Sequence, residues 1–118
     1  AAIALPSYKK MTYRARAASI ISDLNAVRTA AHQYQAEEST WPEDVNRGEI
    51  PAGFEPYVEG VRFTGEGYTL DWDHWGASIG ISVIVEDPGL ESALLGTLKT
   101  SPGTFMRMGN RYTYFVES

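Results

Sequence analysis

The chain has 118 residues, of which 43% are hydrophobic and 21% are charged, and its formal net charge is −5. These values are ordinary for a globular protein, and the length favours a single domain with one modest core. No run of residues approaches the roughly 18–20 consecutive apolar residues that span a bilayer. The chain contains no cysteine, which excludes disulfides, thiolate chemistry and cysteine-ligated metals.

Charge is divided unevenly along the chain. Residues 1–30 contain five basic residues and one acidic residue, a balance of +4, whereas the remainder contains five basic and fourteen acidic residues, a balance of −9. A basic rod attached to an acidic body favours head-to-tail association between copies, because opposite potentials meet. A solvated helix beside an acidic surface explains the same pattern, so charge alone leaves both interpretations open.

Residues 1–40 are predicted to form one long helix. Seven apolar residues recur at intervals of four and three, which places them on one helical face: Tyr13, Ala17, Ile20, Leu24, Val27, Ala31 and Tyr34. The helix is expected to run from about residue 2 to residue 38 and to stop before Pro42, because the residue before a proline disfavours helical geometry. It would measure roughly 55 Å, longer than the body of such a domain, so its first turns are expected to project without intramolecular contacts.

Residues 41–60 are predicted to be an irregular connection, because turn and breaker residues cluster there. Phe54 and Tyr57 are expected to hold this connection to the core. Residues 61–118 are predicted to form an antiparallel sheet with one short helix near residues 88–98.

Four segments have the composition and period of strands: 61–64, 68–72, 77–85 and 111–116. The sequence Gly65-Glu66-Gly67 indicates a hairpin, and Asp87 followed by Pro88 indicates a helix start. Ser101-Pro102-Gly103 is predicted to turn the chain before the last strand. The fold class is therefore α+β, a single domain over residues 1–118 with a long N-terminal helix packed against a C-terminal antiparallel sheet.

The opening Ala1-Ala2-Ile3-Ala4-Leu5-Pro6-Ser7-Tyr8 reads like the tail of a longer apolar segment. It closely resembles the end of the conserved apolar helix of type IV pilins and type II secretion pseudopilins. Basic residues that follow such a stretch, an amphipathic helix ending in an aromatic-proline pair (here Trp41-Pro42), and a C-terminal sheet are also similar to that family. The specific part of the resemblance covers about residues 1–42, and the remainder agrees only in architecture.

The resemblance implies a pilin-like structural subunit of a type IV filament system, not an enzyme. Such a protein is made with a short leader, cleaved and N-methylated by a prepilin peptidase, and anchored in the inner membrane by an apolar half-helix before Ala1. Its globular part is periplasmic, and it assembles with copies of itself and with other pilins or pseudopilins at an inner-membrane platform into a periplasmic or surface filament. The lack of cysteine places type II secretion pseudopilin slightly ahead of pilus subunit, because many pilins of Gram-negative bacteria have a C-terminal disulfide loop.

Three residues are assigned to assembly within this interpretation. Pro6 would kink or loosen the helix inside a filament, although a helix that simply begins near Pro6 would also tolerate it. Arg14 and Arg16 are expected to face solvent and to dock on the acidic body of neighbouring subunits.

Asp71 and Asp73 are the candidates for a metal site. Because they alternate in a strand, both carboxylates are expected on one side, where they could share a hard cation such as Ca²⁺. No third oxygen ligand is identifiable, and polar turn chemistry at a strand end explains the pair without a ligand. No metal and no cofactor are therefore predicted.

Catalysis has little support in the sequence. The two histidines, His32 and His74, lie in a helix and in a turn, and no nucleophile elbow, metalloprotease spacing or glycine-rich phosphate loop occurs. No nucleic-acid partner is expected, because an acidic body repels a polyanion.

Four aromatic residues support an alternative function: Trp72, Trp75, Tyr112 and Tyr114. They either complete the core or form a surface platform. The second interpretation makes the chain a non-enzymatic binding module that recognises carbohydrate or a secreted protein.

Overall fold

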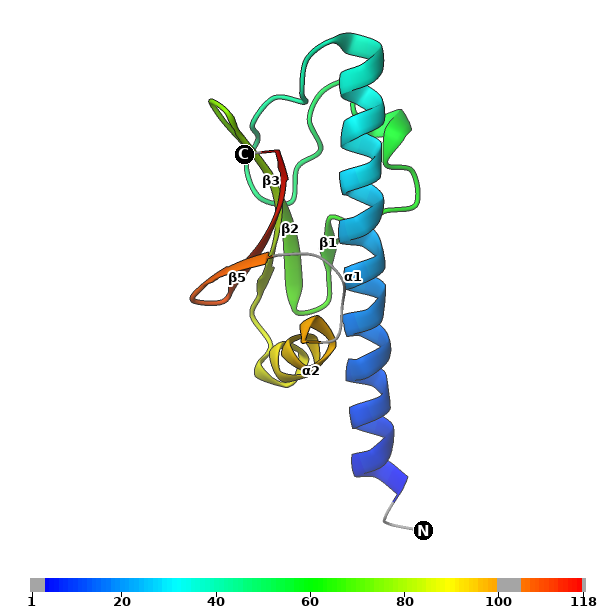
Figure 1. Cartoon of the computed structure of the whole chain (residues 1–118). Helices are drawn as coiled ribbons and strands as arrows, with labels where there is room; N and C mark the ends of the chain where they lie inside the picture. Colours follow the sequence, from blue (N-terminus) through cyan, green and yellow to red (C-terminus); the bar gives the residue numbers. More distant parts are fainter. Residues whose placement is uncertain (1–3, 100–104, 118) are drawn as a thin grey trace.

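The protein is described by a computed structural model over residues 4–99 and 105–117, with side chains for residues 8–99 and 105–116. Its fold is α+β, as predicted, with one long N-terminal helix and a five-stranded antiparallel sheet (Figure 1). Its principal extents are 57 × 25 × 23 Å, so the molecule is a rod with a body attached along part of its length. Within the described part of the chain, no helix combines the length and apolarity needed to cross a bilayer.

The rod is helix α1 (Ala4–Glu38). All seven residues of the predicted stripe are buried or half-buried, which confirms the helical period. The helix ends because Ser39 adopts a left-handed φ of 61° and its N–H donates to the Gln35 carbonyl at 2.9 Å. The predicted end at residue 38 is therefore confirmed, whereas the predicted start near residue 2 lies outside the described residues.

The connection between α1 and the sheet contains one short 3₁₀ helix, η1 (Glu55–Tyr57). Phe54 is fully buried, and its ring stacks on Tyr57 with centroids 6.1 Å apart and meets Tyr34 of α1 edge-on at 5.7 Å. These contacts confirm that Phe54 and Tyr57 hold the connection against the C-terminal half of α1.

The sheet has the strand order β1-β2-β3-β5-β4. Its strands are β1 (Thr64–Gly65), β2 (Tyr68–Trp75), β3 (Ser78–Val85), β4 (Phe105–Met108) and β5 (Arg111–Glu117). All four neighbouring pairs are antiparallel, with β2 and β3 paired from Tyr68↔Val85 to Trp75↔Ser78.

The predicted first strand over residues 61–64 is wrong in its bounds. Only the two residues of β1 pair with β2, and residues 61–63 lie outside the strand, although the Leu70 N–H still donates to the Phe63 carbonyl at 2.7 Å. Strand β2 is longer than predicted, and β4 was missed because its sequence Phe-Met-Arg-Met contains no β-branched residue. The turn predicted at Ser101-Pro102-Gly103 lies outside the described residues.

Helix α2 (Pro88–Leu98) matches the predicted short helix. The Asp87 carboxylate caps it by accepting from the N–H groups of Gly89 at 2.9 Å and Leu90 at 3.4 Å. Leu90, Leu94 and Leu98 are buried, so α2 and α1 together cover the same face of the sheet. The first turns of α1 extend past α2, away from the body (Figure 1).

Candidate functional site

The projecting end of α1 presents an exposed turn of mixed chemistry. Tyr8, Lys9, Lys10 and Met11 are all exposed, and Tyr8 and Met11 are the most exposed large apolar residues among the described side chains of α1, at 70% and 65%. Four consecutive helical residues point in four directions about 100° apart, so this turn presents an aromatic, two cations and a thioether around the whole rod. The prediction that the first turns project holds for the side chains that are described from residue 8 onward.

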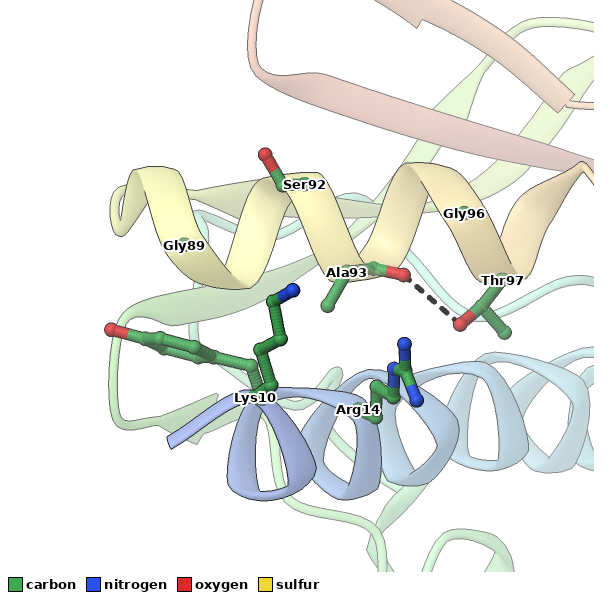
Figure 2. Close-up of a pocket in the computed structure, with 8 residues that line it drawn as sticks. Lys10, Arg14, Gly89, Ser92, Ala93, Gly96 and Thr97 are labelled. Carbon is green, nitrogen blue, oxygen red and sulfur yellow. Dashed lines mark hydrogen bonds between the residues drawn. The ribbon is translucent and has the colours of Figure 1, made fainter. Parts of the chain in front are cut away.

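A groove lies between this end of α1 and helix α2. It has a volume of about 700 Å³ and is lined by Lys10, Tyr13, Arg14, Gly89, Ser92, Ala93, Gly96 and Thr97. Figure 2 shows the side chains of Lys10 and Arg14 reaching from α1 toward α2. The facing side of α2 is made of small residues, so the groove has an apolar floor and a basic wall.

Tyr13, which lines this groove, is held in place by Asp87. The Tyr13 hydroxyl donates to Asp87 Oδ2 at 3.1 Å, while the other oxygen of Asp87 caps α2. Burial alone would raise the pKa of Asp87, but the bonds from Tyr13 and from the two α2 N–H groups outweigh it and lower that pKa. The Tyr13 ring lies so close to Gly89 that a Cβ at residue 89 would lie 2.6 Å from ring atom Cε2.

The two arginines predicted to serve assembly have different surroundings. Arg14 is exposed, as expected. The expectation that Arg16 faces solvent is wrong, because its guanidinium pairs with Glu66 of the β1–β2 turn at 3.2 Å and its side chain is 23% exposed. Packing of that turn against α1 brings the two charges together across fifty residues of sequence.

Pro6, the third residue assigned to assembly, lies within the first described turns of α1, and its side chain is outside the described part of the structure.

Asp71 and Asp73 lie on the same face of β2, as the alternation predicted, but their surroundings differ from both predicted alternatives. They are buried within the strand, with residues 6% and 5% exposed, and are not part of a turn at its end. Arg111 of β5 reaches across β3 and donates from Nη1 to Asp71 at 3.0 Å and to Asp73 at 3.3 Å. A guanidinium therefore occupies the position between the carboxylates that a shared cation would need.

The electrostatics of this cluster are unbalanced. The pKa of Asp73 is raised to about 6: burial is the largest cause and the neighbouring Asp71 charge adds to it, while Arg111 and the Ser82 hydroxyl act in the opposite direction. The Ser82 hydroxyl lies 3.4 Å from Asp73 and 2.7 Å from the Thr113 hydroxyl. Oxygen Oδ1 of Asp71 is buried and has no hydrogen-bond partner among the described residues. Those residues contain no group of three or more His, Cys, Asp or Glu side chains placed to hold a metal ion.

Three of the four aromatic residues considered for a surface platform are in the core. Trp72, Tyr112 and Tyr114 are at most 1% exposed, and only Trp75 is open, at 60%. Trp72 donates to the Pro42 carbonyl at 2.9 Å, and the Tyr112 hydroxyl donates to Glu91 at 2.6 Å. The core interpretation is therefore confirmed for these three residues, and the four do not form one surface.

His32 lies in α1, as predicted, whereas His74 lies in strand β2 and not in a turn. His74 places Nδ1 3.0 Å from the Pro42 carbonyl oxygen, and His32 meets the Trp41 ring edge-on at 5.3 Å. Both contacts attach the connection after α1, one to β2 and the other to α1 itself.

Sequence reasoning missed Arg111 and the groove beside α2. The only signal for Arg111 was a basic residue at the start of a strand otherwise rich in aromatic and β-branched residues. The groove had a weak signal in the small residues Gly89, Ala93 and Gly96 of α2, which recur at intervals of four and three. Comparison of the chain with protein-family models, with curated proteins and with solved structures gave no match.

Proposed function

We propose that this chain is the globular part of a pilin-like structural subunit of a type IV filament system. The observation that supports the proposal best is that α1 is longer than the body it packs against. Its contacts with the body begin at Tyr13, while the turn that precedes Tyr13 is exposed. An exposed apolar and basic helix end attached to a folded body suits a protein whose remaining helix surface is buried by other subunits. The resemblance of residues 1–42 to pilins and pseudopilins supports the same assignment.

Charge at the two ends of α1 supports a head-to-tail arrangement. Lys9, Lys10 and Arg14 lie at one end, and exposed acidic residues cluster near the other end: Glu37, Glu38, Glu43 and Asp44. Contacts between unlike ends of identical subunits do not close on themselves unless a rotation forms a ring, so they generate open polymers. Electrostatic contacts of this kind add orientation more than affinity, and salt weakens them.

The proposal includes residues that precede Ala1. We expect the gene to encode a short leader ending in glycine, followed by an apolar stretch of roughly 20 residues that anchors the protein in the inner membrane. A prepilin peptidase and an inner-membrane assembly platform are then the expected partners, and the globular part is expected to be periplasmic. Reading the sequence upstream of Ala1 tests this part directly, since a hydrophilic upstream segment would contradict it.

Cysteine cross-linking tests assembly, because the chain has no native cysteine to interfere. The double variant Lys10→Cys/Glu38→Cys of the full-length protein would place thiols about 42 Å apart along α1, too far for a bond within one subunit. In cells that assemble the filament, a short bifunctional thiol cross-linker is expected to produce a ladder of multimers. Each single variant serves as the matched control, and is expected to stop at dimers.

A matched pair of charge variants tests the contribution of the basic end. Arg14→Glu is expected to reduce the yield of filaments sheared from cells, whereas Arg47→Glu, which changes another exposed arginine in the connection after α1, is expected to leave it unchanged. Arg16 pairs with Glu66 within the subunit, so it is tested with the double variant Arg16→Glu/Glu66→Arg, in which the two charges are exchanged and the ion pair can still form. Full-length protein recovered only as monomer, with no ladder and no sheared filament, would rule the function out.

A further inference from the structure

We propose that the exposed turn of α1 and the groove beside α2 form a docking surface for a bilayer that contains anionic phospholipid. The proposal goes beyond filament assembly and does not depend on it. A lipid surface offers negative charge with an apolar layer behind it, which matches the cations and the exposed apolar side chains of this end.

The exposed turn has the residue types that lie at a membrane interface. Tyrosine places an apolar ring and a polar hydroxyl at headgroup level, and long lysine side chains lay their stems on apolar surface while the ammonium stays in the polar layer. Tyr8, Lys9, Lys10 and Met11 supply these groups around one turn of α1. Since this turn extends past α2 (Figure 1), it would meet a bilayer before the rest of the body.

The groove behind the turn is suited to a phosphate-bearing headgroup. Lys10 and Arg14 reach into it from α1 (Figure 2), and arginine binds phosphate through two parallel hydrogen bonds. On the α2 side, a Cβ added at Gly96 would meet no heavy atom within 4 Å, so there is open space beside the small residues. A volume of about 700 Å³ accommodates a headgroup and its glycerol backbone.

The cations at this end are not neutralised within the described part of the chain. Lys9, Lys10 and Arg14 make no ion pair there, in contrast to Arg16. Asp87, which caps α2, and Glu91, the acidic residue within α2, have other partners: Asp87 accepts from Tyr13 and the helix N–H groups, and Glu91 accepts from Tyr112 and lies 3.7 Å from Arg107.

The rest of the molecule makes this contact directional. Residues 31–118 have a balance of −9, so an anionic bilayer repels the body and attracts only the projecting end. The rod would therefore stand away from the membrane with its acidic parts in water.

Flotation with lipid vesicles tests the proposal on the chain of residues 1–118. Vesicles of phosphatidylcholine and phosphatidylglycerol in equal parts are compared with vesicles of phosphatidylcholine alone, at low and at high salt. We expect binding to the anionic vesicles only, weakening as salt rises. Each unpaired cation at such a surface contributes about fivefold to partitioning, so Lys10→Gln/Arg14→Gln is expected to bind roughly 25-fold more weakly.

Two further variants separate the possible causes of binding. Arg47→Gln/Arg62→Gln changes the net charge equally but removes exposed arginines elsewhere, and is expected to bind like the wild type. Tyr8→Ser/Met11→Ser keeps every charge, and is expected to lose most of the binding that remains at high salt. Thermal melting of each variant, expected to be unchanged, excludes a folding defect as the cause.

Several results would overturn the proposal. Equal binding to both vesicle types, no binding to either, or equal losses in the two arginine-containing double variants would each show that this end is not an anionic-lipid surface. Self-association in sedimentation that Lys10→Gln/Arg14→Gln abolishes, with vesicle binding unchanged, would assign the groove to a second copy instead. No assembly machinery is present in these assays, so failure of the filament function and failure of lipid binding are separate outcomes.

Discussion

Residues of the two faces of the sheet alternate along the same strands, but apolar packing stabilises one face and charge pairing stabilises the other. The inner face, which α1 and α2 cover, is apolar and aromatic: Leu70, Trp72, Ile81, Val83, Tyr112 and Tyr114. The outer face has a polar centre: Asp71, Asp73, Ser82, Arg111 and Thr113. Buried apolar surface stabilises the inner face, so the cost of a substitution there follows the buried volume that is removed. The outer face depends instead on one guanidinium that two buried carboxylates share, so substitutions there act through charge.

The largest expected effect is on the inner face. Trp72→Ala removes a fully buried indole and its hydrogen bond to Pro42, and should lower the free energy of unfolding by about 3–5 kcal/mol. Trp75→Ala is the matched control in the same strand, and should change it by less than about 0.5 kcal/mol because that side chain is 60% exposed. Urea denaturation followed by circular dichroism measures the free energy of unfolding of both variants. Similar losses for the two variants would show that burial of Trp72 does not account for its contribution.

Removing Arg111 should have the next largest effect. Arg111→Met leaves two buried carboxylates without a counter-charge, and should cost about 3 kcal/mol at pH 8. The loss should be smaller at pH 5, because one carboxylate, Asp73 with its raised pKa, is then protonated. Arg107→Met, which removes a 54% exposed arginine, is the control for the loss of one positive charge. A cost for Arg111→Met that does not change with pH would show that the guanidinium acts through packing and not through charge.

Asp73→Asn should stabilise the protein at neutral pH. The native pKa of Asp73 is raised from 3.8 to about 6, so the folded state takes up the proton at higher pH than the unfolded state. Its ionisation therefore lowers stability as pH rises through about 6, and an uncharged isostere should recover about 2–3 kcal/mol at pH 8 and nothing at pH 3.

Melting temperatures from pH 3 to pH 8 test the expectation for Asp73. The exposed carboxylate variant Glu59→Gln serves as the control and should follow the wild-type curve. Destabilisation by Asp73→Asn at pH 8 would show that the ion pair with Arg111 outweighs the burial of this charge.

The smallest expected effect concerns two glycines of α2, where the same substitution should change the free energy of unfolding in opposite directions. Alanine for glycine within a helix normally stabilises by about 0.5–1 kcal/mol. Gly96→Ala should follow this rule because its Cβ meets open space, whereas Gly89→Ala should destabilise because its Cβ meets the Tyr13 ring at 2.6 Å. In a Tyr13→Ala background, Gly89→Ala should become stabilising. Denaturation of the four proteins of this double-mutant cycle measures the coupling, and additive effects would show that the ring moves aside freely.

The sequence predicted the features that depend on residues close together in the chain, and it missed features that depend on residues far apart. The stripe from Tyr13 to Tyr34 and the Asp87 cap follow from spacing and side-chain chemistry within a few residues, and both were confirmed. Strand β4 was missed because its edge position and its pairing with β5 compensate for weak strand propensity. For the candidate site, alternation placed Asp71 and Asp73 on one face, but it did not show that this face would be buried.

By itself, the sequence determined the elements whose physics is local: one long helix with an apolar stripe, a capped short helix, and strands joined by turns, together with a basic start and an acidic remainder. Only the tertiary structure decided which distant residues meet. Arg111 joins Asp71 from forty positions away, and Lys10 and Arg14 face Gly89 to Thr97 across a groove. Such contacts depend on strand order, register and the angle at which helices pack, and no short stretch of sequence contains this information.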